Sequence, residues 1–382
     1  MFAFPATPPD DAARALRRDV RAFLAAERAS GGFVPAADCW VSAADPAFSA
    51  RLGAQGWLGM TWPAVYGGHD RPMPQRYVVT EELLAAGAPV AAHWIADRQS
   101  GPLILRHGSE AQRAEILPRI AAGTCFFAIG MSEPQAGSDL AAVTTRAERT
   151  ADGWRLNGRK IWSTGAHFSD FMIVLARTSP PDGRDRQVGL SQFLVDLKTP
   201  GVSISGIRDL GGTPHFNETA FDDALLPPDA LLGVEGRGWA QVMSELALER
   251  SGPERFLTSF ALLETAMPTL AAHGDTRIAE RIGRIIAHLR VLRRMSMGIA
   301  QLIQDGASPA TEAALVKELG NRFEGEVIRD LRAMLADIPQ GDHPPALAPL
   351  LRDAVLHLPS NTLRGGSTEI LRGIVARQLG VR

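Results

Sequence analysis

Two neighbouring stretches decide the fold of this chain: residues 131–139, MSEPQAGSD, and residues 156–165, LNGRKIWSTG. In the first, Gly137 lets a backbone approach a flat or phosphorylated ligand closely, and Ser138 adds a hydroxyl. In the second, Trp162 offers a large aromatic plane, and the hydroxyl of Thr164 follows two residues later. Residues i and i+2 share one face of an extended strand, so we expect Trp162 and Thr164 to address one aromatic ligand together. Taken singly, each stretch also fits a structural role, as a loop that caps a helix or as a core tryptophan.

Hydrophobic periodicity divides the 382 residues into three parts. Helical spacing fills residues 1–124, and it returns in residues 236–382, where long segments favour a bundle: 239–272, 277–304 and 311–336. Residues 125–235 instead show short apolar segments between turns, which is typical of a small barrel or sandwich. The pattern predicts an α+β protein with segregated layers and domain boundaries near residues 124 and 235.

One local signal within the strand-rich part predicts a β-hairpin. Asn157-Gly158 lies between the alternating segments 154–156 and 160–162, and Asn-Gly in such a setting favours a two-residue hairpin turn. Further strands are expected at 171–176 and 193–197.

Bulk composition argues against several classes of protein. Lys+Arg 40 against Asp+Glu 42 leaves a net charge of −2, so nothing favours binding to nucleic acid or to an anionic membrane. The two cysteines, Cys39 and Cys125, lie far apart in no Cys/His cluster, which favours buried thiols in a reducing cytosol over a metal site. No apolar run reaches the roughly 20 residues that span a bilayer, and the acidic start is unlike a secretory signal. We expect a cytoplasmic protein without metal.

The two stretches together resemble the acyl-CoA dehydrogenase family. Its central domain carries a [TS]-E-P-x-A-G-S-D segment and then L-N-G-x-K-x-W-x-T, and the same order and spacing recur here from Ser132 to Thr164. The resemblance extends over nearly the whole chain. It implies an N-terminal helical domain (1–124), a central β-barrel (125–235) and a C-terminal four-helix bundle (236–382), with FAD between barrel and bundle and usually across a subunit interface.

The resemblance also implies a reaction and a set of contacts. A base removes a proton from Cα of an acyl-CoA thioester while hydride leaves Cβ for FAD, which gives the 2-enoyl-CoA. Electrons then pass to electron-transfer flavoprotein, and the enzyme is a homo- or hetero-oligomer, typically a dimer of dimers. The residues implied to meet the cofactor are Met131, Ser132, Gly137, Ser138, Trp162, Thr164, Gly366, Ser367, Thr368 and Glu369.

The base departs from the commonest family pattern. Gly365 stands where medium- and short-chain members have a catalytic glutamate, and Glu369 is shifted by four residues. A second subset, which includes isovaleryl- and long-chain-type enzymes, takes its base from an L-x-x-E-R segment after G-x-G-W. Here residues 236–239, GRGW, precede residues 246–250, LALER. The resemblance therefore makes Glu249 the base, and leaves Arg250 either as its support or as part of a structural salt bridge.

Local periodicity supports Glu249 independently. Val242, Leu246 and Phe256 lie at −7, −3 and +7 and would share its helix face, where desolvation raises the pKa of a carboxyl group. Pro253 at i+4 predicts a kink beside it. The alternative is a glutamate paired with Arg250 or Arg255 on a solvated bundle face.

Other departures leave alternatives open. Many family members have an R-x-x-F-G segment whose arginine meets the FAD pyrophosphate. Residues 275–288 contain Arg277, Arg281 and Arg284 but lack the Phe-Gly of that segment. The family's Q-x-x-G-G segment is also only partly matched, around residues 338–341. The chain could thus be a non-catalytic subunit that completes a partner's FAD site, or a flavin monooxygenase or oxidase of the same fold. Steroid side-chain, dicarboxylic, branched and fatty acyl-CoA substrates all stay open.

Overall fold

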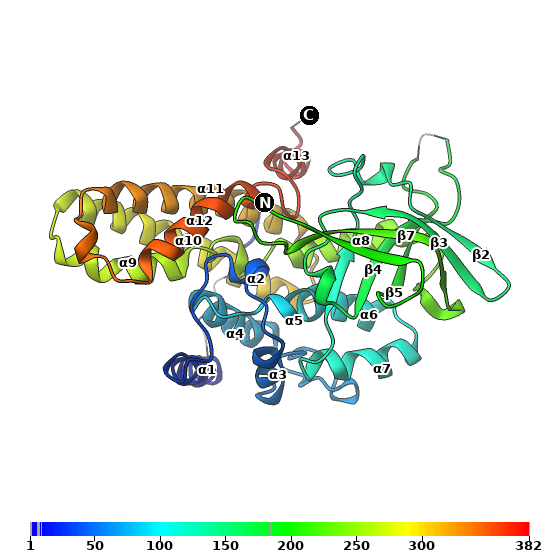
Figure 1. Cartoon of the computed structure of the whole chain (residues 1–382), viewed down its shortest axis with the longest axis horizontal. Helices are drawn as coiled ribbons and strands as arrows, with labels where there is room; N and C mark the ends of the chain where they lie inside the picture. The colour runs from blue at the N-terminus through cyan, green and yellow to red at the C-terminus, as the bar shows by residue number, and fades with distance from the viewer. Residues whose placement is uncertain (1, 6–7, 9, 184, 382) are drawn as a thin grey trace. The chain divides into compact units, whose positions relative to one another are not determined.

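The chain forms two compact units. The computed structural model describes residues 2–5, 8, 10–183 and 185–381, with the side chains of 246–248 left undescribed (Figure 1). One unit, the sheet unit, comprises Ala44–Arg71 and Ala91–Leu246. The other, the helical unit, comprises Met1–Ala43, Pro72–Val90 and Ala247–Arg382. Helices occupy both terminal regions and a sheet the central region, so the predicted α+β class is confirmed.

One eight-stranded sheet dominates the sheet unit. Its order is β6-β7-β3-β2-β4-β5-β8, and β1 pairs with β4 in parallel. β4 is buried on both faces from residue 172 to 176, as expected of an apolar strand with neighbours on either side. In the core, Trp154 packs edge-on against Phe193, with ring centroids 5.0 Å apart. The strands are β1 Phe127–Gly130, β2 Arg146–Thr150, β3 Gly153–Lys160, β4 Phe171–Arg177, β5 Leu190–Asp196, β6 Val202–Ile207, β7 Phe216–Leu226 and β8 Leu231–Leu232.

The hairpin predicted at Asn157-Gly158 is wrong. β3 continues through both residues and pairs with β2 on one side and β7 on the other. Its register against β7 shifts between Leu156 and Gly158, which makes a β-bulge, and Gly158 has φ +145°. Asn157 exchanges two hydrogen bonds with Asp223 of β7, at 2.9 and 3.0 Å. Asn-Gly therefore supplies a polar side chain and a positive φ to a bulge, which needs the same chemistry as a hairpin turn.

Short helices complete the sheet unit. In α7, Ser109 and Gln112 form a reciprocal capping box, and Gly123 after its end has φ +70°, which is typical of a glycine that follows a helix. The helical elements of this unit are α3 Pro46–Ala54, η1 Ala64–Tyr66, α5 Ala91–Ile95, the π-helix η2 Ala96–Ser100, α6 Gly101–His107, α7 Glu110–Ala121, η3 Leu140–Ala142, η4 Ala166–Phe168, η5 Pro228–Ala230 and most of α8, Gly238–Glu249.

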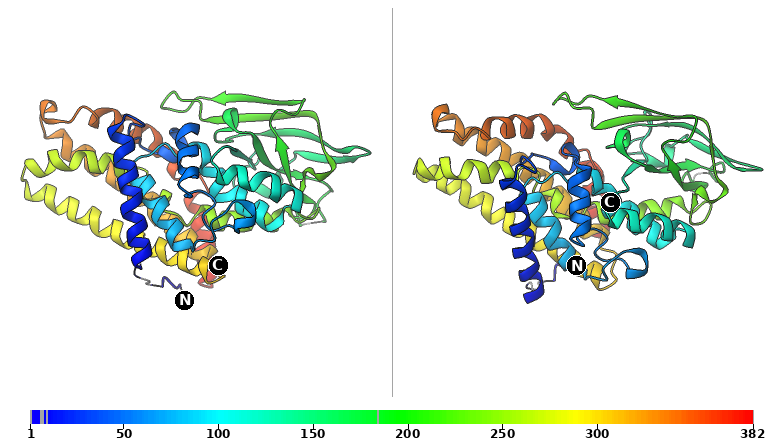
Figure 2. Two further views of the ribbon diagram at one scale, coloured as in Figure 1. Left: turned by 90° about the horizontal axis from the view of Figure 1, so that it is seen from below. Right: turned by 60° about the horizontal axis from the view of Figure 1, so that its bottom comes forward.

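Long helices build the helical unit. α1 begins at the Asp10 cap and buries Leu16, Val20 and Leu24 along one face. It lies beside α4, as both views in Figure 2 show, and Arg17 and Arg21 of α1 pair with the buried carboxylate of Glu82. The elements are α1 Asp11–Ala29, α2 Cys39–Ser42, α4 Met73–Ala85, η6 Pro253–Arg255, α9 Phe260–Ala272, α10 Thr276–Gln304, α11 Ala310–Ala336, η7 Gln340–Asp342, α12 Leu347–Asn361 and α13 Thr368–Gln378.

The segment predicted as one kinked helix from 239 to 272 is two helices. α8 ends at Glu249, and the single turn of η6 separates it from α9. Pro253 has no N–H to donate to the Glu249 carbonyl, so the helix stops rather than bends. Phe256 consequently does not share a helix face with Glu249, and the side chain of Leu246 lies outside the described residues.

Two further observations bear on the composition argument. Cys39 and Cys125 are free and buried. Among the helices of the described residues, none combines the length and the apolar character needed to cross a membrane.

We expect Gly158→Ala to lower the free energy of unfolding by about 1–3 kcal/mol through backbone strain. A β-carbon on Gly158 would lie 2.5 Å from Thr145 Oγ1 and 2.6 Å from Thr145 Cα, so side-chain movement alone cannot relieve the clash. Gly283→Ala in α10 is the matched control, because its β-carbon would meet nothing within 4 Å. Urea unfolding followed by circular dichroism measures both, and equal losses in the two variants would contradict the bulge as the cause.

Candidate functional site

A buried ion pair links the two stretches quoted at the outset. Glu133 Oε1 lies 2.9 Å from Lys160 Nζ, and the two side chains are 1% and 0% exposed. Lys160 Nζ also donates to the main-chain oxygen of Met131 at 3.1 Å. Buried charges persist in proteins when they are paired and hydrogen-bonded, as these are. The pair therefore ties the end of β3 to the loop that follows β1.

The rest of the Glu133 carboxylate is hydrogen-bonded as well. Thr144 N and Thr145 N donate to it at 2.7 and 2.9 Å, and Gln135 Nε2 donates at 2.6 Å. Burial acts to raise the pKa of Glu133, but Lys160 and the hydrogen bonds from Thr145 and Thr144 hold it at about 2. Burial lowers the pKa of Lys160 to about 8, against the attraction of Glu133. Both groups are thus charged at neutral pH.

The loop at residues 131–138 is closed by its own backbone. Glu133 and Ala136 each donate an N–H to the other's carbonyl oxygen, at 2.9 and 3.0 Å, and Ala136 is buried. Gly137 and Ser138 follow on the exposed side, while Met131 and Ser132 are partly buried. Gly137 is not among the residues with positive φ, and a β-carbon there would meet nothing within 4 Å. Gly137 therefore does not adopt unusual backbone angles. Its lack of a side chain leaves open space outside the loop.

Trp162 is exposed and held in a strained backbone. Its φ is +61°, in the left-handed region, and its side chain is 56% exposed. The indole meets Phe216 edge-on, with ring centroids 6.0 Å apart. β3 has already ended at Lys160, so the premise that Trp162 and Thr164 share a strand face is wrong. A large indole held in the solvent at a cost of about 1–3 kcal/mol is nevertheless typical of a functional position.

Main-chain hydrogen bonds hold this strained segment in place. Ser163 N donates to Asn217 O at 3.0 Å, and Asn217 Nδ2 donates back to Ser163 O at 3.0 Å. Gly165 N donates to His215 O at 2.8 Å, and Ile161 N to Ser132 O at 2.9 Å. The sheet unit thus presents residues 131–138 and 162–164 as one supported surface.

In the helical unit, Glu249 is the last residue of α8 and is bound by Arg255. Arg255 Nε and Nη2 donate to the Glu249 main-chain oxygen at 2.9 and 2.6 Å, and Nη2 lies 3.2 Å from Glu249 Oε1. The side chains of Glu249 and Arg255 are 15% and 3% exposed. The carboxylate is thus paired with a cation, as the alternative sequence interpretation held, but in a buried rather than a solvated place. Opposite charge favours the ionised carboxylate.

A turn of two glycines closes over this carboxylate. Gly365 and Gly366 have φ +67° and +104°, which glycine adopts without strain. A β-carbon on Gly365 would lie 2.8 Å from Glu249 Oε1. Arg250, which is 5% exposed, donates from Nε to Gly365 O at 2.8 Å, and Lys317 Nζ donates to Gly366 O at 3.0 Å. Arg250 therefore holds the turn rather than a surface ion pair.

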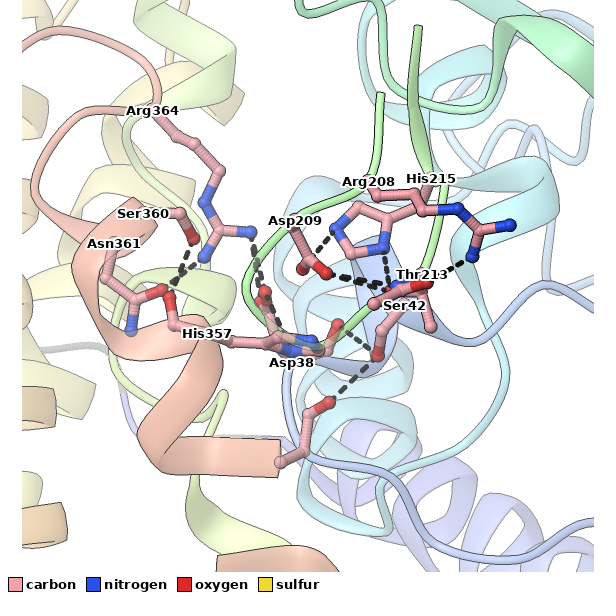
Figure 3. A network of polar contacts seen from close by, with 12 residues as sticks. Asp38, Ser42, Arg208, Asp209, Thr213, His215, His357, Ser360, Asn361 and Arg364 are labelled. Atoms are coloured by element: carbon pink, nitrogen blue, oxygen red, sulfur yellow. Dashed lines mark hydrogen bonds and ion pairs between the residues drawn. The ribbon is translucent and has the colours of Figure 1, made fainter. Parts of the chain in front are cut away.

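A second ion pair holds the residue before the turn (Figure 3). Arg364 Nη1 lies 2.8 Å from Asp38 Oδ2, and its Nη2 donates to Asn361 Oδ1. The ring of Trp40 contacts two guanidinium groups, with its centroid 4.6 Å from Arg364 Cζ and 5.1 Å from Arg255 Cζ. Such cation–π contacts contribute most where water is excluded. Trp40 thereby joins the support of the glycine turn to the arginine that holds Glu249.

The other predicted residues are placed as follows. Ser367 is the N-cap of α13, and Thr368 and Glu369 begin its first turn, with Glu369 exposed. Each arginine of the 275–288 region that the sequence singled out pairs within the helical unit: Arg277 with Asp275, Arg281 with Asp330 and Arg284 with Glu280. The choice among them stays open.

Several supporting residues were missed from the sequence. Glu133 and Lys160 lie inside the quoted stretches, and their opposite charges were the available signal. Lys317 and Asp38 support the glycine turn or the residue before it only through the tertiary fold, so no spacing in the sequence pointed to them.

Family models match most of the chain. The model described as acyl-CoA dehydrogenase, N-terminal domain, matches residues 10–124; the middle domain matches 128–224; and the C-terminal domain matches 236–380. Acyl-CoA dehydrogenase IpdE1 of Mycobacterium tuberculosis is 34% identical over 344 residues, which cover 87% of this chain and 86% of that protein.

Solved structures resemble the whole chain. The structure of the Tcur3481-Tcur3483 steroid ACAD superposes with a TM-score of 0.84 at 26% sequence identity. The match covers 98% of this chain and 99% of the chain in that structure. The ChsE4-ChsE5 complex from Mycobacterium tuberculosis has a TM-score of 0.83 at 27% identity, covering 99% of this chain and 100% of its own.

Replacing one partner of the buried pair should be strongly destabilising. We expect Lys160→Met to lower the free energy of unfolding by about 3–5 kcal/mol, because it leaves the Glu133 carboxylate buried without a cation. Lys198→Met, at an exposed lysine, is the matched control and should change it by less than about 0.5 kcal/mol. In the wild type, the folded pKa of Glu133 is depressed from 4.5 to about 2, so its contribution persists above pH 4.5 and is lost as the pH falls towards 2. Urea unfolding at pH 3 and pH 7 checks both statements; a Lys160→Met loss no larger than that of the control would contradict them.

Proposed function

Because the chain belongs to the acyl-CoA dehydrogenase family, an oxidoreductase family, we propose that it performs FAD-dependent α,β-dehydrogenation of an acyl-CoA thioester, with Glu249 as the base. The observation that carries the proposal is the Glu249 carboxylate, mostly buried, fixed through both its main chain and its side chain by Arg255, and given room by Gly365. Its burial distinguishes this carboxylate from an ion pair on a solvated bundle face.

The surroundings of Glu249 favour a base that is ionised before substrate arrives. Arg255 contacts the carboxylate, and Arg250 and Lys317 hold the turn beside it. A carboxylate in this state accepts the α-proton of the thioester and becomes neutral. Neighbouring positive charge then remains to stabilise negative charge that develops on the thioester carbonyl. The setting differs from the apolar helix face that the sequence suggested.

Residues of the sheet unit fit the flavin. The exposed indole of Trp162 offers a plane for stacking, Gly137 leaves open space beside its backbone, and the hydroxyls of Ser132, Ser138 and Thr164 offer polar contacts. Met131 is a further proposed FAD contact of the sheet unit. In the helical unit, taken by itself, the proposed FAD contacts are Gly366, Ser367, Thr368 and Glu369 at the start of α13. FAD would supply the acceptor for the hydride from Cβ.

Relatives support a more specific proposal for substrate and partners. One similar structure is that of a steroid ACAD, so we propose a bulky acyl-CoA, such as a steroid-derived thioester, ahead of simple fatty acyl-CoA substrates. Electron-transfer flavoprotein is the proposed electron acceptor, and the cytoplasm the proposed location. The similarity to a structure of a ChsE4-ChsE5 complex supports assembly with a second, different chain as one form of the oligomer.

A second candidate is a non-catalytic subunit that completes a partner's FAD site. It is favoured by the three arginines of residues 275–288 described above, which pair with acidic residues of their own chain. The elaborate support of Glu249 argues against it, and equally against an oxygenase or oxidase that would not need this base.

We expect Glu249→Gln to slow anaerobic flavin reduction by an acyl-CoA by about 10²–10⁴-fold, the usual contribution of a general base. The amide retains the shape of the side chain but cannot accept the proton. Glu264→Gln, at an exposed carboxylate of α9, is the matched control and should reduce flavin at the wild-type rate. Bleaching of the flavin absorption is followed with a panel of steroid, branched and fatty acyl-CoA thioesters. Wild-type rates in a Glu249→Gln protein that still holds FAD would remove Glu249 from the mechanism.

The chain purified alone should carry FAD and be bleached by at least one thioester of the panel. The absorption spectrum after gel filtration gives the FAD content. If flavin is absent from the isolated chain and appears only on co-expression with a paralogue whose own base carries the activity, the subunit interpretation replaces the dehydrogenase.

A further inference from the structure

Lys317 is a buried lysine whose surroundings are unusual. It lies on α11 and is 0% exposed. Its Nζ donates to Gly366 O at 3.0 Å; with the Asn321 amide oriented to suit its neighbours, Asn321 Oδ1 accepts from Nζ at 3.0 Å and its nitrogen donates to Asn361 O at 2.9 Å. Among the described residues, these partners are neutral oxygens rather than a carboxylate. Burying an amine in this way is costly, and an apolar side chain would fill the space more cheaply.

Lys317 and Glu249 approach the glycine turn at the same point. A β-carbon on Gly365 would lie 2.8 Å from Glu249 Oε1 and 3.1 Å from Lys317 Cε. The turn is thus packed between the carboxylate and the stem of the lysine. Its two carbonyl oxygens are held by different groups, Gly365 O by Arg250 and Gly366 O by Lys317. The position of the turn against Glu249 therefore depends directly on the Lys317 amine.

Charged groups face Lys317 from several elements. Arg255 of η6 and Glu249 of α8 act on it most strongly, followed by Arg364 and Arg250. Burial, with the charge of Arg255, lowers the pKa of Lys317 to about 6, against the attraction of Glu249. Above pH 6 the amine is therefore mainly neutral and still donates to Gly366 O, and below pH 6 it gains a charge beside the carboxylate.

We propose that Lys317 is a positioning residue for Glu249, which holds the Gly365–Gly366 turn against the carboxylate and sets its proton affinity through its own charge. The proposal rests on the proposed function of Glu249 as the base. Charged Lys317 stabilises the ionised carboxylate, which keeps Glu249 deprotonated at lower pH but makes it a weaker base. Neutral Lys317 releases that stabilisation and makes Glu249 a stronger base at the pH where the reaction runs.

The test compares Lys317→Met, Lys317→Arg and the wild type in the FAD-loaded protein. The pH dependence of the flavin-reduction rate constant is measured with whichever thioester of the panel bleaches the wild type. In Lys317→Met we expect the midpoint of the acidic limb to move up by about one pH unit, because a nearby cation is lost. In Lys317→Arg, whose charge is permanent, the midpoint should stay near that of the wild type, and the plateau should fall because the charge that weakens Glu249 as a base is retained above pH 6. Lys198→Met is the matched control and should leave the profile unchanged.

A second measurement needs no turnover. Hydrogen exchange of the peptide that covers residues 362–371 should be about fivefold faster in Lys317→Met, the factor expected for one lost hydrogen bond, and close to wild type in Lys198→Met. The proposal would be overturned if hydrogen exchange of residues 362–371 were unchanged in Lys317→Met. It would also be overturned if this variant reduced flavin more slowly while the midpoint of its pH profile stayed at the wild-type value. If no thioester bleaches the wild type, the proposed function fails on that result, and unchanged exchange would separately refute the positioning of the turn.

Discussion

The ion pair between Glu133 and Lys160 is the constraint on which the sheet unit depends. Neither charge is accessible to water, and each has the other as its counter-ion. Because one partner follows β1 and the other ends β3, the pair converts two stretches that are separate in sequence into one rigid corner. The strain at Trp162, two residues beyond Lys160, is sustainable because the chain on both sides of it is anchored.

The arrangement of charged groups around Glu249 in the helical unit differs from the one-to-one pair of Glu133 and Lys160. There, one carboxylate is approached by two arginines and by the Lys317 amine, which is mainly neutral above pH 6, and each of these groups also holds part of the main chain. Arg255 binds the end of α8, while Arg250 and Lys317 hold successive carbonyl oxygens of the glycine turn. Charge and geometry are therefore coupled at this position. A change to any of these side chains alters both where the carboxylate lies and how strongly it holds a proton.

Much of the fold could be predicted from local patterns, and the errors have physical causes. Periodicity predicted the order of the helical and strand-rich parts of the chain, because it is a property of short segments. A hairpin was wrongly predicted at Asn157-Gly158, because a β-bulge and a hairpin turn favour the same residues. The sequence predicted a kink after Glu249, whereas the helix ends there. Sequence alone does not show that Arg255 donates to the Glu249 carbonyl oxygen in place of the N–H that Pro253 lacks. Arg250 and Arg255 lie near Glu249 in the sequence and were named as its possible partners, whereas Lys317 comes from a distant segment, so periodicity could not reveal it.

The glycine at 365 has a consequence for how relatives of this chain differ. A side chain rooted there would begin where the Glu249 carboxylate ends, with 2.8 Å between the two positions. A glutamate at position 365, where the resemblance implies one in medium- and short-chain members, could therefore not be added here unless the Glu249 side chain moved, and the φ of +67° at Gly365 would strain it further. Two carboxylates at these positions would also place like charges close together, which disfavours the ionised form of both.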